Sequence, residues 1–159
     1  MMKKWIVAIG LLVVLLGFGL AWPVSASATA VTHPFTGVFT GVVYGDYGSS
    51  APLTLELTQR GRVVTGTAVI GDGLRLNAGG FCGSAYVPAA SASAEGATQR
   101  RQPRQLSATI PFEVSGLTIT AQATGQLATD GETLDVSVKI DTPFPCSRNP
   151  VISGALARE

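Results

Sequence analysis

The chain has 159 residues, 13% of them charged, and its formal net charge is +1. This near-neutral balance provides no global basic field that would attract nucleic acid or an anionic membrane surface. Hydrophobic residues make up 46% of the chain and glycine occupies 19 positions, a composition typical of an exported β protein.

The N-terminal segment has the three features of an export signal. Two lysines precede an uncharged, mostly apolar run over residues 5–22, and small residues follow it. We therefore predict a signal peptide over residues 1–28. The alternative is an uncleaved membrane anchor, because the run is just long enough to span a bilayer. Candidate cleavage positions follow Ala26, Ala28 and Ala30.

Residues 29–159 remain for the mature protein, a length that suits one domain with a real core. Its net charge is near −1, because Lys3 and Lys4 are lost with the signal. The signal predicts a secreted or cell-envelope location, with membrane attachment through residues 5–22 if the segment is retained.

The mature domain opens with a predicted strand over residues 36–44 and a glycine-rich loop over residues 45–50. Tyr44 and Tyr47 flank Asp46 at this loop, so we take these three residues as a candidate rim for a ligand or glycan. The alternative is a solvated loop in which Asp46 only caps a turn.

The clearest element is a β-hairpin over residues 53–70. Its leucines alternate with polar residues, so they share one face of the first strand. A two-residue turn at Arg60-Gly61 would set Leu57 opposite Val64 and Leu55 opposite Gly66. The predicted buried face contains Leu53, Leu55, Leu57, Val64, Ala68 and Ile70.

The middle of the chain is harder to interpret. Short strands are predicted at residues 74–76 and 81–87, followed by a long mobile loop over 88–105 that lacks periodicity and large apolar groups. Three arginines cluster in this loop and are a candidate interaction site for an anionic polymer or lipid. The alternative is that they only keep the loop soluble. They are Arg100, Arg101 and Arg104.

A second hairpin is predicted in the C-terminal half, after a strand over residues 106–114. A long alternating strand over residues 117–128 leads to the turn Asp130-Gly131, and pairing across it sets Leu127 opposite Leu134 and Gly125 opposite Val136. Residues 151–157 then form a short last strand.

These elements amount to about eight antiparallel strands and no convincing helix. Short strands joined by tight turns favour a β-sandwich or a β-barrel. A meander of hairpins favours an up-and-down barrel, because closure removes exposed strand edges. The first and last strands both carry glycines, and we expect them to pair and close the barrel.

Two sequence features carry a resemblance to known proteins. The first strand has a glycine followed two residues later by an aromatic, Gly37-Val38-Phe39, and later strands have interior glycines in Thr65-Gly66-Thr67 and Thr124-Gly125-Gln126. In this pattern the mature chain resembles small exported bacterial barrels of the lipocalin-like or avidin-like type. Those families usually place Trp where Phe39 stands, and residues 29–159 contain no Trp, so biotin binding is not implied.

The two cysteines are the residues whose chemistry the sequence predicts most clearly. Because an exported domain can keep a disulfide, we predict a bond between Cys82 and Cys146, with two free thiols as the alternative. Two cysteines without a neighbouring histidine make an incomplete zinc set, so no metal is expected. No cofactor is expected either, because the chain has no P-loop, no G-x-G-x-x-G and no calcium-binding loop.

Catalytic residues are not expected. His33 is the single histidine, and it stands at the start of the mature domain, where termini are seldom ordered enough for catalysis. We expect an exported, non-enzymatic domain that binds or interacts with an unidentified partner in the envelope or outside the cell. The alternatives are a lipocalin-like carrier of a small apolar ligand and an inhibitor of a secreted hydrolase.

The barrel interior bears on that choice. The second hairpin places Ala121, Ala123 and Gly125 on the inward face, and few aromatics are present to fill the space around them. We expect a mostly filled, narrow barrel with at most a shallow apolar mouth near Tyr44 and Tyr47. A cavity of several hundred Å³, the size of typical ligand pockets, would instead favour the carrier.

Overall fold

A computed structural model describes residues 33–114 and 117–159, and the side chains of all these residues except 112–114 and 117–118. The predicted signal peptide over residues 1–28 lies outside the described residues and stays a prediction. Within the described part, no helix is long and apolar enough to cross a membrane.

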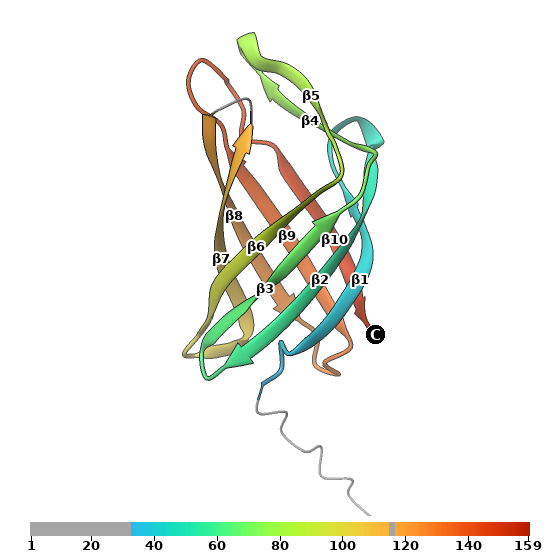
Figure 1. Cartoon of the computed structure of the whole chain (residues 1–159), viewed down its shortest axis with the longest axis vertical. Helices are drawn as coiled ribbons and strands as arrows, with labels where there is room; N and C mark the ends of the chain where they lie inside the picture. Colours follow the sequence, from blue (N-terminus) through green and yellow to red (C-terminus); the bar gives the residue numbers. More distant parts are fainter. Residues whose placement is uncertain (1–32, 115–116) are drawn as a thin grey trace, which may run out of the picture. The chain divides into compact units, whose positions relative to one another are not determined.

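Eight antiparallel strands close into a barrel, which confirms the predicted all-β, up-and-down class (Figure 1). Around the wall the order is β1, β10, β9, β8, β7, β6, β3 and β2. The first and last strands pair as expected, with Thr40 opposite Ala157. The strands of the wall are β1 (Gly37–Tyr44), β2 (Ser50–Arg60), β3 (Val63–Ile70), β6 (Ala90–Gln99), β7 (Gln102–Val114), β8 (Leu117–Leu127), β9 (Thr133–Asp141) and β10 (Val151–Arg158).

A separate two-stranded hairpin is inserted between β3 and β6. It consists of β4 (Leu74–Gly79) and β5 (Gly83–Val87), with a short 3-10 turn, η3 (Gly80–Cys82), at its tip. Figure 1 shows it at the same end of the barrel as the β9–β10 loop and the β1–β2 connection, which contains a second 3-10 turn, η2 (Asp46–Gly48). We call this the hairpin end.

The opposite end of the barrel, which we call the terminal end, is where β1 begins and β10 stops (Figure 1). The turns between β2 and β3, β6 and β7, and β8 and β9 lie there as well. The predicted disulfide is confirmed at the hairpin end, where Cys82 of η3 bonds to Cys146 of the β9–β10 loop with their Cα atoms 5.2 Å apart.

The register predicted for the first hairpin is wrong by two residues. Leu57 lies opposite Gly66, and Leu55 lies opposite Ala68. The turn residues are Gly61 and Arg62, and Gly61 has a φ of 62°. Glycine at the first position of a two-residue loop suits a type II′ turn, which explains the shift. Because the shift is even, each side chain keeps its predicted face.

The second hairpin has the predicted register. Leu127 lies opposite Leu134, and Gly125 lies opposite Val136. The side chains of Leu127 and Leu134 are fully or almost fully buried, as the alternating pattern indicated.

The prediction of a long loop over residues 88–105 is wrong, because most of this segment belongs to the barrel wall. Residues 90–99 form β6, which pairs with β3 and β7. Its inward positions carry small residues and its outward positions are exposed, so the period of two is present but weak. Alanine and glycine bury little apolar area, and the pattern was therefore missed. The inward residues are Ala92, Ala94, Gly96 and Thr98.

The buried apolar core of the described residues draws on β1, β2, β3, β4, β8, β9 and β10. Phe39 and Val43 of β1 and Leu156 of β10 have no solvent-exposed surface, and neither does Leu134 of β9. Phe35, just before β1, is also fully buried. Large groups therefore fill the interior beside β1 and β10, and the space that remains is lined by the other six strands of the wall.

Candidate binding site

A partly open cavity of about 110 Å³ lies inside the barrel. Its walls come from β2, β3, β6, β7, β8 and β9, while β1 and β10 contribute nothing to it. The inward-facing side chains of the lining are aliphatic, and no charged group reaches the cavity. The lining residues are Leu53, Leu55, Leu57, Ala68, Ala94, Leu106, Ala108, Ile110, Ala123, Thr124, Gly125, Leu134, Val136 and Val138.

Small residues create this cavity. Four alanines line it on four different strands, so the wall is set back wherever the sequence supplies only a methyl group. Gly125 has no side chain at all. A Cβ built there would meet its nearest neighbour, Leu134 Cδ1, at 3.2 Å. Larger inward residues such as Leu55 and Val136 remain only half-buried, because they face the hollow. The four alanines are Ala68, Ala94, Ala108 and Ala123.

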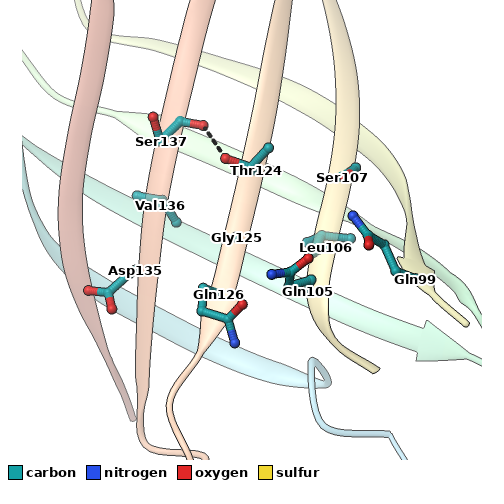
Figure 2. A pocket seen from close by; sticks show the side chains of 10 residues that line it. All are labelled: Gln99, Gln105, Leu106, Ser107, Thr124, Gly125, Gln126, Asp135, Val136 and Ser137. Carbon is teal, nitrogen blue, oxygen red and sulfur yellow. Dashed lines mark hydrogen bonds between the residues drawn. The ribbon is translucent and has the colours of Figure 1, made fainter. Parts of the chain in front are cut away.

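A second hollow of about 390 Å³ lies on the outside of the same wall (Figure 2). It shares Leu106, Thr124, Gly125 and Val136 with the cavity, so the two hollows are separated by little more than backbone at Gly125. Figure 2 shows the polar side chains around it, which come from β8, β9, β7 and the end of β6. They are Gln99, Gln105, Ser107, Thr124, Gln126, Asp135 and Ser137.

This outer hollow has the character of a solvated face. The side chains around it are exposed or half-buried, and the Thr124 hydroxyl makes one long hydrogen bond of 3.4 Å to the Ser137 carbonyl oxygen. The Gln126 amide donates to the Leu127 carbonyl oxygen at 3.3 Å. Among the described residues no buried polar group points into the hollow, so the apolar cavity behind it is the better candidate for a binding site.

The terminal end is closed by residues that the sequence did not single out. The Arg158 guanidinium donates to the carbonyl oxygens of Pro34 and Thr36 at 2.6 Å each, and to that of Gly131 at 2.8 Å. Buried Gln59 accepts a hydrogen bond from the Phe35 N–H at 3.0 Å. These bonds hold the segment before β1 across the end of the barrel, and Phe35 closes it.

The candidate rim formed by Tyr44, Asp46 and Tyr47 lies at the hairpin end and lines neither hollow. Both tyrosines are exposed. Asp46 has a structural contact, because its Oδ2 accepts a hydrogen bond from the Asn77 N–H at 2.7 Å and joins η2 to β4. The expected apolar mouth is therefore not where the hollow lies, and ligand binding by these three residues stays a prediction.

The arginine cluster lies at the terminal end. Arg100 and Arg101 form the turn between β6 and β7, and Arg104 is in β7 itself. All three are exposed, and Arg104 Nη1 donates to the Ala128 carbonyl oxygen at 3.4 Å. The cluster thus lies on the β6–β7 turn and the start of β7, and its role as an interaction site stays a prediction.

Titratable residues do not converge in the described part of the chain. His33 is exposed, and its backbone carbonyl accepts a hydrogen bond from the Thr36 N–H. Across residues 33–114 and 117–159, no three His, Cys, Asp or Glu side chains gather in a way that could hold a metal ion.

Two phenylalanines stand out at the hairpin end because almost all of their surface is exposed. Phe81, beside Cys82, is 94% exposed, and Phe144, two residues before Cys146, is 95% exposed. The disulfide therefore joins two loops that each carry an exposed aromatic ring. Sequence reasoning identified the disulfide but not this pair, since each ring lies in a loop without periodicity.

No protein-family model matches this sequence, and no curated protein matches it. A solved structure described as EF1p2_mFAP2b bound to DFHBI is similar in fold, with a TM-score of 0.57 and 10% sequence identity. The match covers 79% of this chain and 94% of that chain. At this identity the similarity shows the fold alone, and it supports the β-barrel that the resemblance in the first strand implied.

Proposed function

We propose that this protein is an exported, non-enzymatic binding protein that holds a small apolar molecule inside its barrel. One observation carries this proposal: the barrel contains a cavity of about 110 Å³ whose inward-facing side chains are all aliphatic. A polar or charged ligand would lose its hydrogen bonds to water there without finding a partner, at a cost of several kcal/mol.

The size of the cavity limits the ligand. Typical pockets for drug-sized ligands measure about 300–1,000 Å³. An engineered apolar cavity of about 150 Å³ in another protein binds benzene or xenon. The present cavity, at about 110 Å³, is smaller than both, in keeping with the mostly filled barrel expected from the sequence, and it suits at most a molecule of about one ring or a short aliphatic chain. The similar barrel binds DFHBI, which supports the view that this architecture can hold a ligand.

Export is supported by the N-terminal sequence and by the disulfide between Cys82 and Cys146, a bond that persists in oxidising compartments. The protein would then work outside the cell or in the cell envelope. Bacterial lipocalin-like carriers are the class that this combination of export and barrel resembles.

Xenon and benzene binding to the oxidised mature protein tests the cavity. We expect saturable chemical-shift changes in the methyl groups of Leu55, Ile110 and Val136, which line it. Ala94→Leu adds three carbon atoms to the lining and should abolish binding. Ala97→Leu is the matched control, because Ala97 lies on the same strand with its side chain exposed, and it should bind like the wild type.

Two outcomes would contradict the proposal. If neither probe shifts these methyl signals in the wild-type protein, the cavity is not a binding site. If Ala94→Leu and Ala97→Leu both bind as the wild type does, the probe occupies another place.

A second candidate function is interaction with another envelope or extracellular protein, which includes inhibition of a secreted hydrolase. It is favoured by the ordered hairpin end, where the disulfide holds Phe81 and Phe144 almost fully exposed. Exposed aromatics of this kind are typical anchors of protein interfaces. Loss of partner binding or inhibition in a Phe81→Ser, Phe144→Ser double variant, with the cavity intact, would identify this role.

A further inference from the structure

The β4–β5 hairpin has two outer edges, one of which is covered by other parts of the chain while the other is unpaired. The outer edge of β4 is covered by side chains of the β1–β2 connection. Ser49 Oγ accepts from the Arg75 N–H at 2.8 Å and donates to the Arg75 carbonyl oxygen at 3.1 Å, and Asp46 accepts from the Asn77 N–H. The Ala78 carbonyl oxygen accepts from backbone N–H groups of the β9–β10 loop. This edge therefore has no room for another strand.

The outer edge of β5 is open. In an antiparallel pair, the residues whose N–H and C=O groups face the partner strand alternate with residues whose groups face away. Arg75 and Asn77 face away from β5, because they bond to Ser49 and Asp46. Their partners Tyr86 and Ser84 must then face away from β4. Within the described part of the chain, β5 pairs with β4 alone and no hydrogen bond reaches its outer side.

This open edge lacks the charges and the proline that often prevent pairing with another chain. Natural edge strands are protected by lysine, proline, a bulge, an inward-pointing charge or a very short length. Of these, β5 has only its short length, and the irregularity in the pair lies on β4, between Asn77 and Gly79. β5 reads Gly-Ser-Ala-Tyr-Val, with no charge and no proline, and its first four residues are exposed. The barrel wall itself is closed and offers no such edge. Among the described strands, the edge of β5 thus has free backbone groups to which another strand can add.

We propose that a second copy of this chain adds to β5, forming a two-fold symmetric dimer with antiparallel β5 strands. The outward groups of Ser84 and Tyr86 are self-complementary in this arrangement. With the symmetry axis at Ala85, Ser84 of each copy lies opposite Tyr86 of the other, and both residues use the backbone groups that β4 leaves free. The absence of charge on β5 means that two identical edges meet without repulsion.

The exposed aromatic rings fit the same arrangement. Antiparallel pairing about Ala85 sets Gly83 of one copy opposite Val87 of the other, so Phe81 would lie beside the end of the partner's β5 strand. The disulfide already holds the hairpin in place, so little ordering is needed for pairing. Figure 1 shows the hairpin projecting beyond the barrel wall, where a second hairpin can approach it.

A lipid surface is the competing occupant for an exposed aromatic end, and the open edge argues against it. The hydrocarbon interior of a bilayer cannot supply hydrogen bonds to the outward N–H and C=O groups of Ser84 and Tyr86. A second strand can supply both. An edge of five residues is short, so we expect a concentration-dependent dimer of the weak class, with less than about 1,200 Å² buried.

Sedimentation equilibrium of the oxidised mature protein, from about 10 μM to about 1 mM, tests this inference over the range expected for weak dimers. The wild type should change from monomer to dimer. Tyr86→Pro removes only an outward N–H and keeps the bonds to β4, so the hairpin should persist while dimerisation weakens by about tenfold or more. Tyr86→Thr keeps the N–H in a good strand residue and should retain most of the association.

Circular dichroism and a thiol count on each variant will confirm that the barrel and its disulfide are intact. A wild type that stays monomeric throughout the concentration range overturns the inference. A dimer whose dissociation constant is the same in Tyr86→Pro also overturns it, because the contact would then lie elsewhere. Co-flotation of the monomer with phosphatidylcholine vesicles, lost in a Phe81→Ser, Phe144→Ser variant, would assign the aromatic end to lipid instead.

Discussion

The guanidinium of Arg158, at the end of the last strand, lies 4.5 Å from the centre of the Phe39 ring in the first strand. The same group donates hydrogen bonds to backbone carbonyls before β1 and in the β8–β9 turn. One side chain thus joins the two strands that close the barrel to the segment that covers its terminal end. Phe39 is fully buried beneath it.

Replacement of Arg158 should therefore destabilise the protein more than replacement of an ordinary surface arginine. Arg158→Lys keeps the charge but loses the planar group that serves three carbonyls and stacks on the ring. We expect the free energy of unfolding to fall by about 2–3 kcal/mol, measured by urea denaturation. Arg60→Lys is the control, since Arg60 is exposed, and it should change stability by less than about 0.5 kcal/mol. Equal effects would show that the Arg158 contacts contribute little.

Replacement by alanine should affect the stability very differently at two strand glycines. A Cβ at Gly66 would collide with the Glu56 carbonyl oxygen, whereas one at Gly125 would have its nearest contact at 3.2 Å and point into the cavity. We expect Gly66→Ala to cost about 2–4 kcal/mol through displacement of the backbone. Gly125→Ala should change stability by less than about 1 kcal/mol. Comparable losses in chemical denaturation would mean that β2 and β3 approach less closely than the structure shows.

Removal of the disulfide should weaken the protein without unfolding the barrel. The bond joins residues 64 positions apart, for which chain entropy gives a stabilisation of about 4 kcal/mol as an upper value. The Cys82→Ser, Cys146→Ser variant should lose up to this amount in thermal or urea unfolding. Its far-ultraviolet circular dichroism should stay unchanged, because the bond lies outside the barrel wall. Loss of the β spectrum would show that the hairpin end is needed for folding.

Limited proteolysis will distinguish the barrel wall from a loop at residues 88–105. Because Arg104 lies within β7, trypsin should not cut there faster than at Arg62 in the β2–β3 turn or at Arg60, which ends β2. Fragment masses taken during a time course will give the order of cleavage. Rapid early cutting at Arg104 would mean that β6 and the start of β7 open readily in solution.

The predictions that depended on local pattern and turn chemistry were largely correct. Leucines alternating with polar residues in 53–57 identified a strand and its buried face, and Asp130-Gly131 identified both a turn and its register. A chain with two cysteines has one possible internal disulfide, and the structure contains it. These features follow from neighbours in the sequence, so a single chain is enough to recognise them.

Local pattern failed where the signal was weak or ambiguous. The β6 strand was missed because its inward positions hold alanine, glycine and threonine, which carry little hydrophobic contrast with the exposed serines. The first hairpin was shifted because Gly61 can occupy either position of a two-residue loop, and both choices keep the leucines on one face.

The sequence alone was therefore enough to predict the all-β class from alternation and turn residues, the closing pair from the glycines of the first and last strands, and the disulfide from the cysteine count. The position of the cavity, the unpaired edge of β5 and the contacts of Arg158 became visible only in the tertiary structure. These depend on residues far apart in the chain: four alanines on four strands, Ser49 and Asp46 against β4, and the first strand beside the last. Closure of the barrel brings these residues together. A local sequence pattern gives no information on which side chains meet across the interior.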